Sequence, residues 1–159
     1  MQIRVQHYNR ERTRSLLGIG SSLSLIRGGV MDDRFVLQGN LIILDTKTGL
    51  AWQRGAAEYP MVCKDGYAYI QKLNESKFAG YDDWRFPNKE EMGSLIMSEE
   101  DRNTGLYLHS LFSSQRNLWT STEAGHHRAC YVDFYYGDVY VIEQNYANYY
   151  VRAVRTAQA

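Results

Sequence analysis

The clearest pattern in this chain lies near its C-terminus, where apolar residues take every second position in several stretches between residues 118 and 155. The intervening positions carry Tyr, Asp, His and Asn, and a period of two is typical of β-strands that bury one face. We expect strands here, with a hairpin turn at residues 136–138, and a loop-rich stretch before them at 99–117. The residues expected to point inward are Val132, Phe134, Val139 and Val141.

The preceding part of the chain predicts both strands and helices. A short hairpin is expected around residues 38–40 and a further strand at 50–52. Apolar residues at helical spacing predict a helix over residues 64–76. Asn88 followed by Glu91 has the spacing of a capping box and predicts the start of a second helix. Two helices beside an antiparallel sheet make the expected fold class α+β.

Residues 1–34 differ from the rest in composition. They contain six arginines, three acidic residues and scattered apolar residues that are too few to form a core. We interpret them as an N-terminal arm and residues 35–159 as the domain. Such an arm is expected to attach the domain to a second copy or to a larger carrier, or else to pack back on its own domain.

Charge and cysteine content narrow the function classes. The 18 basic and 18 acidic residues balance, so we expect no nucleic-acid partner. No apolar run is long enough for a membrane span. The two cysteines, Cys63 and Cys130, could form one bridge or remain buried thiols, and the second interpretation is favoured.

No catalytic or metal-binding constellation stands out. His126 and His127 are adjacent, so on a strand they would point to opposite faces and could hardly share one metal ion. Pairing Cys130 with a histidine gives no nucleophilic site with a recognisable third residue. We therefore expect a protein that is not an enzyme and needs no cofactor or metal.

Tyrosine concentration points instead to ligand binding. Seven tyrosines lie between residues 131 and 150, and Tyr offers a large, rigid contact area at low conformational cost. We expect a protein or glycan ligand on the outward positions of the strands and of the loop that follows them. The candidate ligand-binding residues are His126, His127, Tyr131, Asp133, Tyr135, Tyr136, Asp138, Tyr140, Ile142, Asn145, Tyr146, Asn148 and Tyr149.

Four ordered motifs resemble one known family. They read DTKTGLAW at 45–52, GYDDWRFPNKEE at 80–91, WTSTE at 119–123 and YVRAVR at 150–155. These are similar to the motifs of the Lcl-type C-terminal domain, the Legionella collagen-like family, and the similarity covers about residues 35–156. The resemblance implies a C-type-lectin-like fold with a twisted antiparallel sheet, two helices and a loop-rich ligand face. Family members are adhesins and ligand binders, some of which recognise sulfated glycans.

The same fold and closing motif occur in the variable proteins of diversity-generating retroelements. Those systems rewrite adenine-rich codons, so variable positions fill with Asn, Tyr, Asp, His, Ser and Ile, a roster that the candidate residues resemble. The expected function is therefore a diversified target-binding protein on a virion or cell surface. The alternative is a glycan-binding adhesin module of fixed specificity. The related formylglycine-generating enzymes need a closely spaced C-terminal cysteine pair, which this chain lacks.

The tryptophans and arginines inside these motifs are expected to be structural. The tryptophans, which bury the most apolar area, are assigned to the core: Trp52, Trp84 and Trp119. The arginines are expected to pair with carboxylates such as Asp83 or Glu123. These arginines are Arg85, Arg152 and Arg155.

Overall fold

The computed structural model describes residues 6–7 and 34–157 of the chain. The arm interpreted for residues 1–34 therefore lies almost entirely outside the described residues. In the described part, the elements follow in this order: β1 (Gln6–His7), β2 (Phe35–Gln38), β3 (Ile42–Asp45), β4 (Leu50–Gln53), α1 (Asp65–Glu75), the 3₁₀ turn η1 (Phe78–Gly80), α2 (Lys89–Gly93), β5 (Asn117–Glu123), β6 (Arg128–Asp133), β7 (Asp138–Glu143) and β8 (Val154–Thr156).

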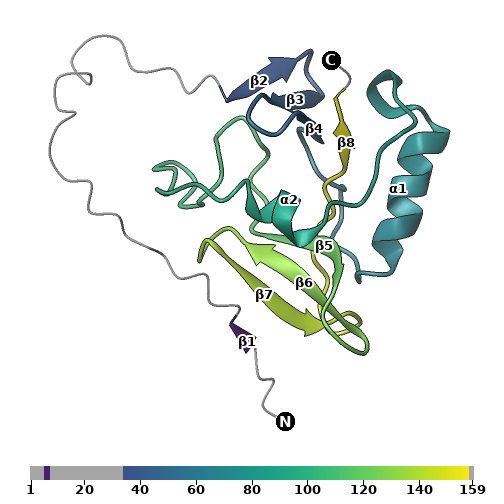
Figure 1. Ribbon diagram of the computed structural model, residues 1–159, viewed down its shortest axis with the longest axis vertical. Helices are drawn as coiled ribbons and strands as arrows, with labels where there is room; N and C mark the ends of the chain where they lie inside the picture. The colour runs from purple at the N-terminus through teal and green to yellow at the C-terminus, as the bar shows by residue number, and fades with distance from the viewer. Residues whose placement is uncertain (1–5, 8–33, 158–159) are drawn as a thin grey trace, which may run out of the picture.

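The described strands form two antiparallel four-stranded sheets, as Figure 1 shows. The first sheet has the order β2-β3-β4-β8, and the second has the order β1-β7-β6-β5. In the second sheet β1 pairs with the outer edge of β7, His7 lying opposite Tyr140. The fold class is therefore α+β, as the sequence predicts, but the strands divide into two sheets instead of the expected one.

The closing segment of the chain joins the two sheets. Tyr150 forms a parallel bridge with Leu118 of β5, and the Tyr150 carbonyl accepts from the Trp119 amide at 3.0 Å. Four residues later the segment pairs with β4 as strand β8, with Val154 opposite Trp52. The motif at residues 150–155 thus connects the sheets along its whole length.

The two helices cover different parts of the core. α2 begins at the predicted capping box: the Asn88 side chain accepts from the Glu91 amide at 2.8 Å, and Glu91 accepts from the Asn88 amide at 3.0 Å. Met92 of α2 packs with Leu118 and Val132, which point to one face of the second sheet. The opposite face of β5 and β6 contributes to another cluster, shared with α1. The centre of the second sheet is therefore buried on both faces.

The motif tryptophans are core residues, as expected. Trp52 and Trp119 are fully buried and Trp84 is 3 % exposed. Cys63 and Cys130 are both buried and free. Burial and, to a lesser extent, the negative charge of Glu123 raise the pKa of the Cys63 thiol to about 11.

The motif arginines follow the prediction in two of three cases. Arg155 pairs with Asp83 at 2.6 Å, and Arg85 pairs with Glu91, also at 2.6 Å. Arg152 does not pair with a carboxylate among the described residues. It is fully buried, and its donors reach a backbone carbonyl of Gly55 and acceptors of the loop around residues 113–115 instead.

Candidate ligand-binding site

The turn between β6 and β7 is built around Asp133. Its Oδ1 atom accepts from the amides of Tyr135 and Tyr136 at 2.8 and 3.1 Å, and its carbonyl accepts from the Gly137 amide at 2.7 Å. Gly137 has a φ of 67°, a conformation in which glycine carries no steric cost. The turn holds the side chains of Tyr135 and Tyr136 outward, 52 % and 58 % exposed.

Arg116 ties this turn to the neighbouring strand. Its Nε and Nη2 atoms donate to the Asp133 carboxylate at 3.2 and 3.0 Å. Its guanidinium also lies 4.7 Å from the ring centre of Tyr135 and 5.2 Å from that of Tyr136. Because the carboxylate is bound by both the guanidinium and two amides, the turn is held from two sides.

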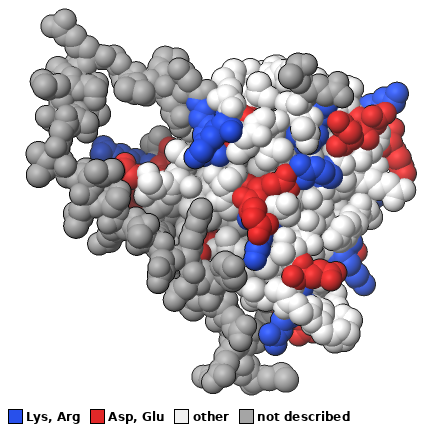
Figure 2. All heavy atoms as spheres, viewed as in Figure 1, with Lys and Arg blue, Asp and Glu red and all other residues white. Residues whose placement is uncertain are grey.

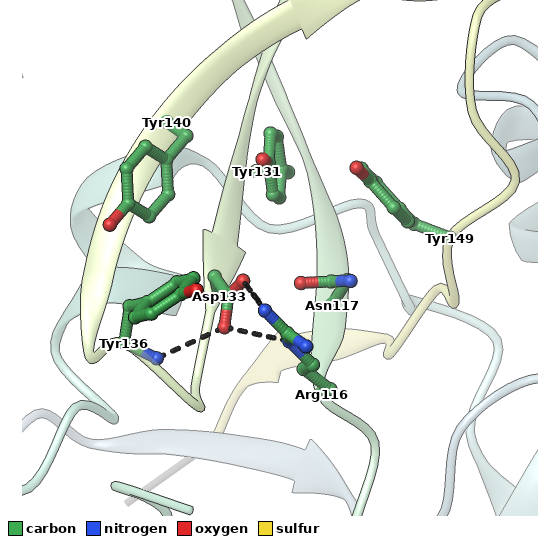
Figure 3. A pocket seen from close by; sticks show the side chains of 7 residues that line it. All are labelled: Arg116, Asn117, Tyr131, Asp133, Tyr136, Tyr140 and Tyr149. Carbon is green, nitrogen blue, oxygen red and sulfur yellow. Dashed lines mark hydrogen bonds and ion pairs between the residues drawn. The ribbon is translucent and has the colours of Figure 1, made fainter. Parts of the chain in front are cut away.

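Beside this turn is an open pocket of about 520 Å³, shown in Figure 3. Four tyrosine rings surround the hollow, and a carboxylate, a guanidinium and an amide lie along its lower edge. We call this site the tyrosine pocket. It is lined by Arg116, Asn117, Tyr131, Asp133, Tyr136, Tyr140 and Tyr149.

The aromatic rings of the pocket contact one another in a chain. Tyr131 lies 4.6 Å from Tyr149 and 5.8 Å from Tyr140 between ring centres, and Tyr140 lies 6.4 Å from Tyr136. Burial raises the pKa of Tyr131 well above its ordinary range, and a hydrogen bond with Tyr149 raises it further. The Tyr131 hydroxyl therefore stays protonated at neutral pH and can donate or accept a hydrogen bond.

Asn117 contributes an unused acceptor to the pocket. It lies opposite Asp133 in the register of β5 and β6. Its side-chain oxygen is buried and has no hydrogen-bond partner among the described residues. A buried carbonyl oxygen of this kind favours a ligand with an N–H or O–H donor.

All the candidate residues of the sequence analysis except Ile142 fall into two groups in the structure. Five of them line the tyrosine pocket, Tyr135 lies in the turn beside it, and Asp138 begins β7 opposite Asp133. The second group lies at the other end of the β6–β7 hairpin, where the Gln144 amide donates to the His127 carbonyl at 2.7 Å. Over six-residue strands the two ends are about 17–20 Å apart. The members of the second group are His126, His127, Asn145, Tyr146 and, further along the loop, Asn148.

Four of the positions interpreted as outward are in fact buried. Tyr131, Asp133, Tyr140 and Ile142 are only 4–8 % exposed. The prediction of outward positions was wrong for these residues because both faces of the sheet are covered, and a tyrosine ring buries as readily as an apolar side chain. Three of the four still present an edge to the pocket, whereas Ile142 packs in the core and is not among the lining residues.

Arg116 and Asn117 line the pocket but were not predicted from the sequence. Both lie at the end of the stretch interpreted as loop-rich, where no periodic pattern marks them. The signal that points to Arg116 is Asp133 itself, since a carboxylate inside a strand requires a donor nearby. Because β5 pairs with β6 so that Leu118 lies opposite Val132, the residues just before Leu118 lie next to Asp133.

Comparison with protein families decides the classification. Residues 41–155 match the family model described as the Lcl C-terminal domain. The chain belongs to the Lcl C-terminal domain family. All seven residues of the tyrosine pocket lie inside the matched part of this Lcl domain. Among curated proteins, none matches the chain.

Membership indicates a ligand-binding module of adhesin type. Within the described part of this Lcl domain, no helix is long and apolar enough to cross a membrane. The same residues contain no group of three or more His, Cys, Asp or Glu side chains that could hold a metal ion. On the face shown in Figure 2, basic and acidic side chains alternate, and neither sign forms an extended field.

Proposed function

We propose that the chain is a non-enzymatic display domain that binds its target in the tyrosine pocket and on the turn beside it. The observation that carries this proposal is the convergence of Tyr131, Tyr136, Tyr140 and Tyr149 on one open hollow. Exposed or half-exposed tyrosines on a well-braced turn resemble the rigid aromatic anchors of antibody paratopes. Virion or cell surface is the proposed location.

The pocket divides into a fixed floor and an adaptable rim. Tyr131 is 7 % exposed and contacts the Trp119 ring edge to face, and Asp133 holds the turn, so changes at either residue would disturb the fold. Tyr135 and Tyr136 are exposed and make mainly ring contacts. A ligand would therefore meet a constant base and a surface that tolerates substitution.

More specifically, the chain is proposed to be a variable protein of a diversity-generating retroelement, in which the rim would vary and the floor would stay constant. The support for this proposal is the Tyr, His and Asn composition of the exposed turn and loop positions. If the gene is diversified, an adenine-rich near-copy of the region encoding about residues 118–155 lies beside a reverse transcriptase gene. Differences between the copies should fall at the exposed positions and spare Tyr131 and Asp133. The exposed positions are His126, His127, Tyr135, Tyr136, Asn145, Tyr146 and Asn148.

A second candidate is an adhesin module of fixed specificity. The observation that favours it is the structural role of Tyr131 and Asp133, which keeps the floor of the pocket constant. Sequencing the flanking DNA separates the two: a locus without the near-copy and the reverse transcriptase selects the fixed module.

The proposed binding site is tested on a glycan and protein array with the full chain. Tyr136→Ala should reduce binding to any array hit by about tenfold or more, because exposed aromatic anchors carry much of the binding energy. The matched control is Tyr67→Ala on α1, a tyrosine that is 52 % exposed and contacts one other ring. Equal binding by both variants and the unmodified chain would show that the tyrosine pocket is not the binding site.

A further inference from the structure

The mouth of the tyrosine pocket carries an imbalance of charge. Asp133 and Asp138 are direct partners in the register of β6 and β7, so two carboxylates face each other across the strands. Like charges in this position destabilise a sheet. Arg116 pairs with Asp133 at 3.0 Å, and no ion pair to Asp138 is formed by the described residues. The mouth of the pocket therefore contains two carboxylates, of Asp133 and Asp138, but one guanidinium, of Arg116.

The Tyr140 hydroxyl is affected by the same imbalance of charge. Burial raises the pKa of Tyr140, and Asp138 and Asp133 raise it further, whereas Arg116 lowers it. The negative charge at the mouth therefore reaches the interior of the pocket.

The tyrosine rings add to this field. The face of an aromatic ring is negative and attracts a cation within about 6 Å of its centre. Arg116 already shows such a contact in the structure, since its guanidinium lies within that distance of Tyr135 and Tyr136. A second guanidinium or ammonium group could use the ring faces inside the hollow in the same manner.

We propose that the tyrosine pocket receives a basic side chain of a protein partner, with arginine preferred to lysine. The inference rests on the proposed function, that this pocket is the binding site. The Asn117 oxygen favours a cation that also donates hydrogen bonds, which excludes a quaternary ammonium group as the best ligand. Arginine is preferred because its planar group stacks on aromatic rings and donates in several directions at once.

The probe for this inference is Nα-acetyl-arginine amide, titrated into the full chain at low ionic strength and followed by NMR. Its control is the citrulline analogue, which keeps the planar shape and some of the N–H donors but replaces one amino group by a carbonyl oxygen and carries no charge. We expect saturable shifts at Asn117 and Tyr140 with the arginine compound and binding weaker by about tenfold with citrulline. Equal binding of the two compounds, or tighter binding of tetramethylammonium, would overturn the inference.

A pair of variants tests the role of charge. Asp138→Asn keeps the acceptor for the Val139 amide and removes the carboxylate that has no ion pair in the described part of the chain. It should weaken arginine binding by about three- to tenfold. Asp82→Asn, at an exposed acidic residue remote in sequence, makes the same change of net charge and should leave binding unaltered. Equal effects of the two variants would contradict a specific cation site.

Failure of this inference is distinguishable from failure of the proposed function. A ligand that depends on Tyr136 but is not displaced by the arginine compound leaves the pocket as the binding site and refutes the cation. An anionic ligand whose affinity rises in Asp138→Asn refutes the cation as well and likewise leaves the pocket as the binding site. A ligand that is indifferent to Tyr136→Ala refutes both.

Discussion

Removing the Arg152 side chain tests the most unusual interaction of the core. Its Nε atom donates to the Gly55 carbonyl at 2.8 Å, and its Nη2 atom donates to the Ser113 carbonyl at 2.9 Å and to Gln115 Oε1 at 3.1 Å. The guanidinium also lies 4.9 Å from the ring centre of Phe112. Burial lowers the pKa of Arg152 to about 9, so the group is still charged at neutral pH.

Opposing free-energy terms set the size of the effect. Arg152→Ala removes a donor from four part-buried acceptors, the Gly55 carbonyl, the Ser113 carbonyl, Ser113 Oγ and Gln115 Oε1, and each acceptor left without a partner costs about 1–3 kcal/mol. It also removes a buried apolar stem worth about 2 kcal/mol. The variant no longer has to bury a charge, and the loss of this desolvation penalty stabilises it by several kcal/mol. We expect a net loss of about 3 kcal/mol in the free energy of unfolding.

Urea denaturation followed by tryptophan fluorescence measures this loss. With a typical slope of about 1–3 kcal/mol per molar urea, the midpoint should fall by at least about 1 M. Arg152→Lys should lose about 2 kcal/mol, because one ammonium group cannot reach the carbonyls of both Gly55 and Ser113. The control is Arg85→Ala, which removes a 42 % exposed partner of Glu91 and should cost at most about 1 kcal/mol. If Arg152→Ala costs no more than this control, the buried guanidinium does not brace the fold.

Three further predictions concern single contacts of the scaffold. Asn88→Ala removes the side-chain acceptor of the Glu91 amide and should lower the unfolding free energy by about 1 kcal/mol in urea denaturation. Burial, the largest single influence, opposes ionisation of Asp45, but hydrogen bonds from Arg34, Thr48 and the Lys47 amide together with the charge of Arg34 outweigh it and lower the pKa of Asp45 below its ordinary value. The stability that this carboxylate contributes is therefore present above about pH 4 and lost as the pH falls below it. Asp45→Asn should therefore flatten the acid side of the stability-against-pH curve, and an unchanged slope would contradict this. Cys63, with its pKa raised to about 11, should react with a disulfide reagent at pH 8 only after denaturation, and fast reaction in the folded protein would show that the thiol is accessible.

Local patterns in the sequence predict the framework of this fold well. Helical spacing places α1 within one residue of its observed ends, and the Asn88–Glu91 pair marks the start of α2. Both signals depend on contacts within a few residues. The tryptophans are predicted to be buried because no other side chain removes so much apolar area from water. Such features need no knowledge of which strands become neighbours.

The burial and the partners of several side chains depend on residues that are distant in sequence, so local patterns do not predict them. The alternation of apolar and polar residues predicts that Tyr140 points outward. It is nevertheless only 8 % exposed, because the sheet is covered on that face too. Arg152 looks like a partner for a carboxylate, but the loops at residues 55 and 113 offer carbonyl groups instead. Arg116 carries no periodic signal at all and becomes recognisable only when β5 and β6 are aligned.

The double role of Asp133 limits how this site can vary. Its carboxylate fixes the turn that presents Tyr135 and Tyr136, and the same carboxylate supplies charge at the mouth of the tyrosine pocket. A substitution there would change ligand chemistry and disorder the rim together. Specificity can therefore change independently of stability only through the exposed tyrosines and through Asp138, which can lose its carboxylate and still accept from its own strand. Affinity for a basic partner is thus adjustable at the rim, while the floor that positions it stays constant.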